Sequence, residues 1–180
     1  MGEAIKQAEY AGAKGEIPIG CVIVLGGKII SRGQNQRETK KDATAHAEII
    51  AIRRACKKLN DWRLSGAEIY VTLEPCPMCA GAIMNARIDK IYFGSYEKKS
   101  GACGSAFDVT GTTALNSRAE VVGGVREDEC RAILTRANFC ELYKGWIDEH
   151  IRDPHACPLN DLYVNWEIPD PCAARIFLNR

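Results

Sequence analysis

The sequence predicts an α/β fold within residues 1–144. Short apolar runs rich in β-branched residues alternate along the chain with stretches whose apolar residues recur at helical spacing, and this alternation is typical of layered α/β folds. A chain of 180 residues is long enough to bury one sizeable core. Its 46% hydrophobic and 26% charged residues are typical of a soluble globular protein and exclude a disordered or fibrous one.

The first elements expected are an amphipathic helix and a β-hairpin. The helix ends at Gly12 or Gly15. Small and apolar residues at near-helical spacing form its inward face: Ala4, Ile5, Ala8 and Ala11. The strand-like runs Cys21–Leu25 and Lys28–Arg32 are separated by Gly26-Gly27, and this arrangement predicts a hairpin.

A second helix and a buried strand are expected next. The side chain of Asp42 or Thr44 can cap this helix, which ends near Asn60. Its inward face is again made of small and apolar residues: Ala47, Ile50, Ala51 and Ala55. The run Glu68–Leu73 is expected to form a buried strand.

The stretch Glu74–Met84 is expected to make a sharp turn into a third helix, whose first turn tolerates Pro77 because amides there need no intrahelical partner. Strands are expected at Ile88–Phe93 and Glu120–Val122, and a helix from about Glu127 to Leu134. The connection Gly94–Ser117 is rich in Gly and Thr and has little periodicity. Connections of this length in compact domains are often functional.

Location and the C-terminal region follow from composition. The longest purely apolar run, Cys21–Leu25, is far shorter than a membrane span, and the first residues hold no apolar signal core, so we expect a cytoplasmic protein without a membrane partner. Nine cysteines without regular spacing favour reduced thiols over a disulfide framework. Residues 145–180 lack helical or strand periodicity and are expected to form an atypical tail.

Cys76 and Cys79 form a Cys-x-x-Cys motif at the start of the third expected helix. Two thiols three residues apart lie on one face of a first turn, where the helix dipole favours thiolates. His46, at the start of the second helix, completes a Cys₂His set. A zinc ion with three protein ligands keeps its fourth position open, which is the pattern of catalytic rather than structural sites.

Glu48 lies two residues after His46. Residues two apart in a helix lie about 200° around its axis, so the pair is badly placed to hold one ion together. Glu48 is better suited to carry protons beside the metal. Zinc lowers the pKa of bound water toward ~7, and a nearby carboxylate can move the displaced proton to a substrate nitrogen, as the replacement of an amine by water requires.

His-x-Glu followed by Pro-Cys-x-x-Cys is the signature of zinc-dependent nucleobase deaminases. Over roughly Ala4 to Leu134, the chain resembles the bacterial tRNA-specific adenosine deaminase family of the cytidine deaminase-like superfamily. The matching segments are Gly15–Gly20, Asn35, Thr44–Glu48, Asp61–Leu64, Tyr70–Ala82, Arg87-Ile88 and Lys99–Ala102. Glu97, where this family commonly has Asp, and Ala137–Cys140, where it usually has a Phe-Phe pair, depart from the pattern.

The resemblance implies a three-layer α/β/α fold with a central mixed sheet and a homodimer in which both subunits contribute to substrate binding. It implies hydrolytic conversion of adenosine to inosine at the wobble position of a tRNA anticodon. His46, Cys76 and Cys79 would bind one Zn²⁺ per subunit, and Glu48 would transfer protons.

The resemblance also assigns substrate contacts. Asn35 would hydrogen-bond the flipped adenine, and three residues would shape its pocket: Pro18, Ala47 and Pro75. The substrate would be the tRNA anticodon stem-loop, because proteins that recognise RNA by sequence bind unstacked loop bases. Candidate phosphate contacts are Arg37, Lys98 and Lys99.

Three alternatives stay open on the sequence alone. A deaminase of free guanine, cytosine or a nucleotide would use the same metal set, and so would the deaminase of the riboflavin pathway, although its usual reductase domain is absent from this sequence. A non-catalytic zinc-stabilised module would instead need a fourth ligand. The candidates for that ligand are Cys56, Cys103, Cys130, His150 and His155.

Overall fold

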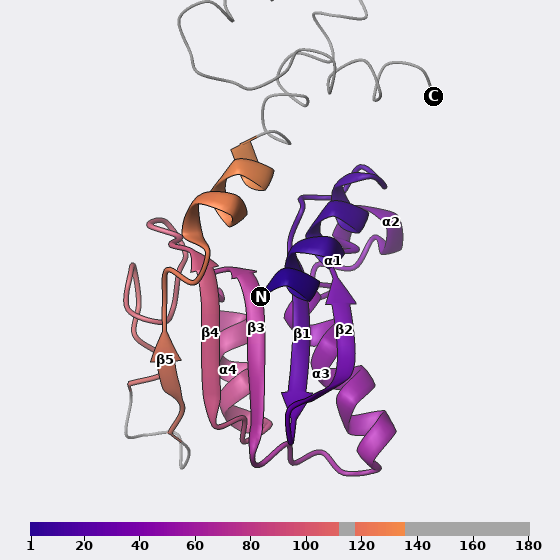
Figure 1. Cartoon of the computed structure of the whole chain (residues 1–180), viewed down its shortest axis with the longest axis vertical. Coiled ribbons are helices and arrows are strands. Elements are labelled where there is room, and N and C mark those ends of the chain that lie inside the picture. The colour runs from indigo at the N-terminus through magenta and orange to yellow at the C-terminus, as the bar shows by residue number, and fades with distance from the viewer. Residues whose placement is uncertain (112–117, 136–180) are drawn as a thin grey trace, which may run out of the picture. The chain divides into compact units, whose positions relative to one another are not determined.

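Strands in the described residues form one mixed sheet (Figure 1). The structure is a computed structural model and describes residues 1–111 and 118–135. The strands are β1 (Gly20–Leu25), β2 (Lys28–Gln34), β3 (Ala67–Leu73), β4 (Lys90–Ser95) and β5 (Glu120–Val122), in the order β2-β1-β3-β4-β5. β1 is antiparallel to both β2 and β3, whereas β3, β4 and β5 are parallel.

Helices cover both faces of this sheet. They are α1 (Gly2–Gly12), α2 (Arg37–Lys40), α3 (Ala47–Leu59) and α4 (Pro77–Asn85), and residues 127–135 are also helical. In Figure 1, α1 lies in front of the sheet while α3 and α4 lie behind it. The predicted three-layer α/β/α fold with a mixed sheet is confirmed.

Two glycines let helices approach the β1–β2 hairpin from opposite sides. A Cβ at Gly20 would lie 2.1 Å from the carbonyl oxygen of Ala4 in α1, and one at Gly33 would lie 2.0 Å from that of Ala47 in α3. Cys21, which follows Gly20 and pairs with Gly33, belongs to the core cluster beneath α3. Since neighbouring strand residues face opposite sides of a sheet, these contacts place α1 and α3 on opposite faces.

Gly33→Ala is expected to destabilise the fold by about 3 kcal/mol, because its methyl group would displace the first turn of α3. The control is Gly81→Ala in α4, where an added Cβ meets nothing within 4 Å. That change should leave the free energy of unfolding unchanged or raise it by up to about 1 kcal/mol. Urea unfolding of both variants measures the difference, and equal stabilities would contradict the packing described here.

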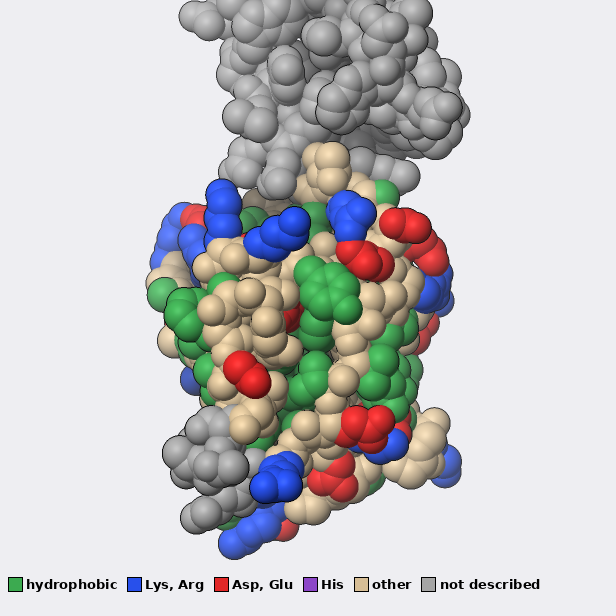
Figure 2. All heavy atoms as spheres, turned by 90° about the vertical axis from the view of Figure 1, so that its left-hand side faces the viewer, with side chains coloured by type: hydrophobic (Ala, Val, Ile, Leu, Met, Phe, Trp, Pro, Cys, Tyr) green, Lys and Arg blue, Asp and Glu red, His purple; other side chains and the backbone are tan. Residues whose placement is uncertain are grey.

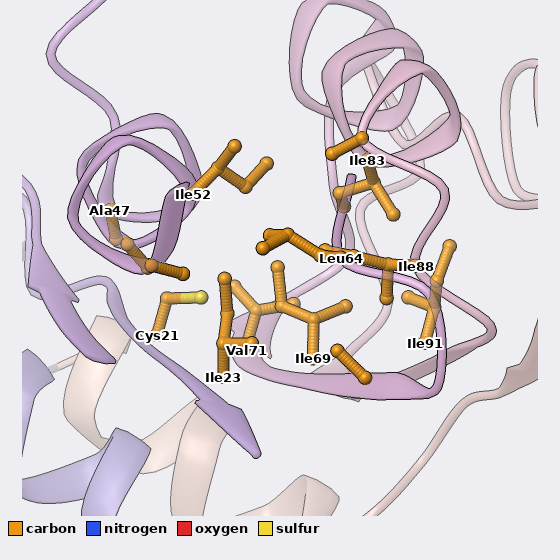
Figure 3. Packing of buried hydrophobic residues seen from close by; sticks show 14 of the residues in the cluster. Cys21, Ile23, Ala47, Ile52, Leu64, Ile69, Val71, Ile83, Ile88 and Ile91 are labelled. Atoms are coloured by element: carbon orange, nitrogen blue, oxygen red, sulfur yellow. The ribbon is translucent and has the colours of Figure 1, made fainter. Parts of the chain in front are cut away.

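The main core lies between the sheet and the α3–α4 layer (Figure 3). Ile23, Ile69 and Ile91 project toward this layer from β1, β3 and β4, and they meet Ile52 of α3 and Ile83 of α4. Burying branched apolar side chains contributes about 1.5–3 kcal/mol each, so this layer holds α3 and α4 against the sheet.

Most predicted elements are confirmed, but the expected cap of α3 is wrong and one short helix was not predicted. The short helix α2 was not expected. Neither Asp42 nor Thr44 caps α3, because His46 is its N-cap residue and makes no side-chain cap bond. Asp42 instead closes a tight turn, where its Oδ1 accepts hydrogen bonds from the amide and hydroxyl of Thr44 at 2.8 and 2.7 Å.

Two further expectations concern the membrane and the tail. Within residues 1–111 and 118–135, no helix is both long and apolar enough to span a bilayer. The predicted boundary at residue 144 and the tail at 145–180 lie outside the described residues.

Candidate metal and substrate site

The carboxyl ends of β2, β3 and β4 meet at one edge of the sheet. β2 and β3 are both antiparallel to β1, and β4 is parallel to β3, so these three strands run in the same direction. Each leads into a segment that carries candidate site residues: Asn35 to Glu48 after β2, Glu74 to Cys79 after β3, and Tyr96 onward after β4. The ends of such strands are the usual position of binding sites in open α/β sheets.

His46, Cys76 and Cys79 converge at this edge. Their ligand atoms all lie within 4.8 Å of one another, and Nδ1 of His46 is 3.7 Å from Sγ of Cys76 and 3.5 Å from Sγ of Cys79. Tetrahedral zinc with ordinary Zn–S and Zn–N bonds requires N···S separations of about 3.6 Å. The three residues therefore fit a zinc ion in both donor type and spacing.

Two helix N-termini hold these ligands. His46 is the N-cap residue of α3 and Cys76 that of α4, and both have extended backbone angles. Cys79 is in the first turn of α4, buried against the core. Two neighbouring helices thus direct their positive ends at the cluster, which favours thiolate ligands.

The two thiols titrate very differently. A hydrogen bond from Cys79, helped by one from His46, lowers the pKa of Cys76 to about 4, so Cys76 is a thiolate at neutral pH. The hydrogen bond with Cys76, together with burial, raises the pKa of Cys79 above its ordinary value. A thiolate beside an imidazole is a donor set that soft or borderline metal ions prefer.

Glu48 lies in the first turn of α3, with 4% of its surface exposed. Burial raises the pKa of its carboxyl, which also hydrogen-bonds the Cys79 thiol. Glu48 therefore adjoins the cluster, yet it is not part of the group whose ligand atoms lie within 4.8 Å of one another. This placement suits a proton carrier better than a fourth ligand.

The structure also bears on the closed, four-ligand alternative. Within the described part of the chain, His46, Cys76 and Cys79 form the one cluster of potential metal ligands. Cys56 and Cys130 are free thiols outside it, and Cys103 is likewise not a member. His150 and His155 lie outside the described residues.

Asn35, proposed to read the base, is buried at the end of β2. The backbone N–H of Asn35 donates to the carbonyl of Ile19 at 3.0 Å. The backbone N–H of Gln36 donates to the carbonyl of Ala45, also at 3.0 Å. The loop between Gln36 and Ala45 is therefore closed at its base, with Asn35 at one end and His46 just beyond the other. Three residues expected to shape the pocket are also buried: Pro18, Ala47 and Pro75.

The basic candidates lie at the surface. Arg37 is the exposed first residue of α2, with its guanidinium 3.8 Å from the Glu38 carboxylate. Lys98 and Lys99 are exposed in the loop after β4. Figure 2, which views the side of the molecule on which β5 lies, shows Lys and Arg side chains at both ends of the described surface, with Asp and Glu side chains among them.

Two buried carboxylates, Glu16 and Glu74, hold loops of the site and were not singled out from the sequence. Glu74 has 3% of its surface exposed and accepts hydrogen bonds from the amides of Glu97, Cys103 and Ser105 at 3.0–3.1 Å. It thereby fastens the loop that carries Lys98 and Lys99 beside the metal cluster. The available signal was an acidic residue directly after an apolar strand and before the Pro-Cys motif.

A family model supports this interpretation of the site. The model for the zinc-binding region of cytidine and deoxycytidylate deaminases matches residues 1–95. The fold and the His/Cys/Cys cluster define a zinc-binding deaminase.

Similarity to individual proteins identifies a family within the zinc-binding deaminases. A tRNA-specific adenosine deaminase of Bacillus subtilis is 51% identical over 144 residues, which cover 80% of this chain and 89% of the relative. One from Aquifex aeolicus is 47% identical over 115 residues, which cover 64% of this chain and 76% of the relative. The chain therefore belongs to the tRNA-specific adenosine deaminase family.

Two solved deaminase structures also resemble this chain. A structure from a study of A-to-I editing by tRNA:A34 deaminases at the wobble position superposes with a TM-score of 0.71 at 44% identity, covering 73% of this chain and 95% of that one. A guanine deaminase of Bacillus subtilis superposes with a TM-score of 0.52 at 41% identity, and the match covers 59% of this chain and 68% of that one.

Proposed function

We propose that this protein converts adenosine to inosine by hydrolysis at the wobble position of a tRNA anticodon. The observation that carries the proposal is the cluster of His46, Cys76 and Cys79, with the buried carboxylate of Glu48 beside it. The tRNA adenosine deaminases named above, at 51%, 47% and 44% identity, are more similar to this chain than the guanine deaminase at 41%, which favours adenosine in tRNA over a free base. We further propose one zinc ion per subunit, a homodimer in which both subunits contribute to substrate binding, and a cytoplasmic location.

The reaction adds one water to adenine and releases ammonia, so a C6–O bond forms and the C6–N6 bond breaks. His46, Cys76 and Cys79 would hold zinc, which would lower the pKa of a water toward ~7. The carboxylate of Glu48 would accept a proton from the attacking water and deliver it to a nitrogen of the substrate. Its buried position limits exchange of that proton with solvent.

The remaining site residues place the base. Asn35 hydrogen-bonds the flipped adenine, while Pro18, Ala47 and Pro75 shape the pocket around it. Arg37, Lys98 and Lys99 contact the phosphates that flank the target nucleotide. Tyr96 and Phe107, which belong to the same loop as the two lysines, are 48% and 53% exposed and offer rings on which unstacked bases can lie.

A short hairpin assay tests the substrate assignment. An anticodon stem-loop with adenosine at the wobble position is incubated with the zinc-loaded protein, and inosine is measured by mass spectrometry. Free adenosine, guanine and cytosine serve as parallel substrates. Inosine in the hairpin supports the proposal, whereas turnover of guanine or cytosine without turnover of the hairpin refutes it.

Replacing both Lys98 and Lys99 by alanine is expected to raise KM for the hairpin about tenfold. The slope of log(kcat/KM) against the logarithm of the salt concentration should become shallower by about 1–2. The control is Lys57→Ala with Lys58→Ala. Those lysines are exposed in the last turn of α3, at the end of a 13-residue helix opposite to His46. Equal effects of the two double variants would show that the loop lysines do not contact phosphates.

A further inference from the structure

Glu16 is a buried carboxylate in the segment between α1 and β1, with 3% of its surface exposed. Its Oε1 accepts hydrogen bonds from the amide and hydroxyl of Thr39 at 2.7 and 2.8 Å. Its Oε2 accepts from the amide of Glu38 at 3.1 Å and from Nδ2 of Asn35 at 3.4 Å. One side chain therefore binds both Asn35 and the helix α2 that follows it.

The position of Glu16 is itself fixed by the end of α1. Gly15 takes a positive φ of 74°, which reverses the chain after the helix. The amide of Glu16 then donates to the carbonyl of Ala11 in the last turn at 3.1 Å. Because Ala11 is fully buried, this anchor ties Glu16 to the packed α1 layer rather than to a free loop.

Glu16 remains ionised in this environment. Burial by itself would raise the pKa of its carboxyl, but the hydrogen bonds from residues 37–39 outweigh burial and hold the pKa below its ordinary value. An ionised carboxylate only accepts hydrogen bonds. The group of Asn35 that faces Glu16 must therefore be the NH₂ end of its amide, and the carbonyl oxygen Oδ1 must point away.

Oδ1 of Asn35 is the end of the amide available to a ligand. No described residue donates a hydrogen bond to it, and it is not among the fully buried side-chain atoms that lack a partner. The backbone on both sides of Asn35 is held by its bond to Ile19 and by the bond from Gln36 to Ala45. With the backbone held, the side-chain amide of Asn35 could still take either of two flipped orientations. The hydrogen bond to Glu16 selects one of them.

We propose that Glu16 is a positioning residue that locks the Asn35 amide with Oδ1 toward the substrate, so that the site selects a nucleoside presenting a hydrogen-bond donor at that point. This inference rests on the proposed function, in which Asn35 contacts the target nucleoside. Glu16 itself does not touch the substrate. It acts by excluding the flipped amide, which would present two donors in place of an acceptor.

Glu16→Gln tests the proposal, because glutamine keeps the shape of the side chain but can pair with either end of the Asn35 amide. We expect kcat/KM for the hairpin to fall about tenfold, mainly through KM, with zinc content unchanged. Thr39→Val is the matched control, since it removes one hydrogen bond to Oε1 and leaves the contact with Asn35 intact; it should change kcat/KM less than about twofold.

A double-mutant cycle separates positioning from general loop structure. In an Asn35→Ala background, measured under single-turnover conditions, Glu16→Gln should have no further effect. The same tenfold loss in both backgrounds would overturn the proposal, as would an unchanged kcat/KM for Glu16→Gln alone.

The side-chain NH₂ signals of Asn35 in a ¹⁵N-correlated NMR spectrum give a readout that does not depend on turnover. They should shift in Glu16→Gln and stay in place in Thr39→Val, and unshifted signals in Glu16→Gln would overturn the proposal. A wild-type protein that leaves the hairpin unchanged would refute the proposed function instead, while these spectra would still report on the contact between Glu16 and Asn35.

Discussion

Glu48→Gln is expected to lower kcat for the hairpin by about 10³- to 10⁴-fold while the protein keeps its zinc. The amide has nearly the same shape as the carboxylate but cannot accept and return a proton, so the loss reports on proton transfer rather than on packing. Glu48 is not a member of the ligand cluster, and metal binding should therefore survive. Single-turnover kinetics and plasma emission analysis of zinc measure the two quantities on one sample.

Glu9→Gln is the control for this change, because Glu9 is an exposed residue of α1. Its kcat should match that of the wild type. Unaltered turnover in Glu48→Gln would exclude proton transfer by this residue, whereas a zinc-stabilised binding module would show no turnover in the wild type either.

Cys79→Ala is expected to abolish zinc binding and to lower the free energy of unfolding by at least about 3 kcal/mol. Cys79 supplies one of three ligands, and the free energy of metal binding is part of the stability of the folded chain. The variant should contain close to no zinc by plasma emission analysis. Its melting temperature should match that of the wild type treated with a chelator.

Cys56→Ala serves as the comparison for Cys79→Ala. Cys56 is a half-buried free thiol near the end of α3, and its Sγ hydrogen-bonds the carbonyl of Trp62 at 3.6 Å. This variant should keep its zinc. A Cys79→Ala protein that still bound zinc at the wild-type level would show that the ligand assignment is wrong.

Strong local patterns made most of the fold predictable. The β-branched run after Gly20 and the glycine pair at its end identify the hairpin, and the inward-facing alanines identify α1 and α3. The start of α3 was misplaced because Asp42 has the chemistry of a cap but forms a local turn with Thr44 instead. Helix α2 was missed because four polar residues carry no periodicity; long-range hydrogen bonds to Glu16 hold it.

The candidate site likewise contains residues that the sequence indicates and residues that only the structure identifies. His46, Cys76 and Cys79 were predicted to meet because each belongs to a short motif whose spacing is dictated by metal chemistry, and the structure places them together. Glu16 and Glu74 belong to no such motif. Their partners lie more than 15 residues away in sequence and are mostly backbone amides, which every residue offers, so only the folded chain reveals what they hold.

X-ray absorption spectroscopy of the zinc-loaded protein tests the central claim most directly. The account predicts zinc bound by two sulfur atoms at about 2.3 Å and otherwise by light atoms at about 2.0 Å, consistent with Cys76, Cys79 and His46 and a remaining position open to water. In Cys79→Ala this signal should vanish with the metal. A spectrum with three or four sulfur neighbours would mean that the site is closed, and it would contradict the assignment of a hydrolytic centre.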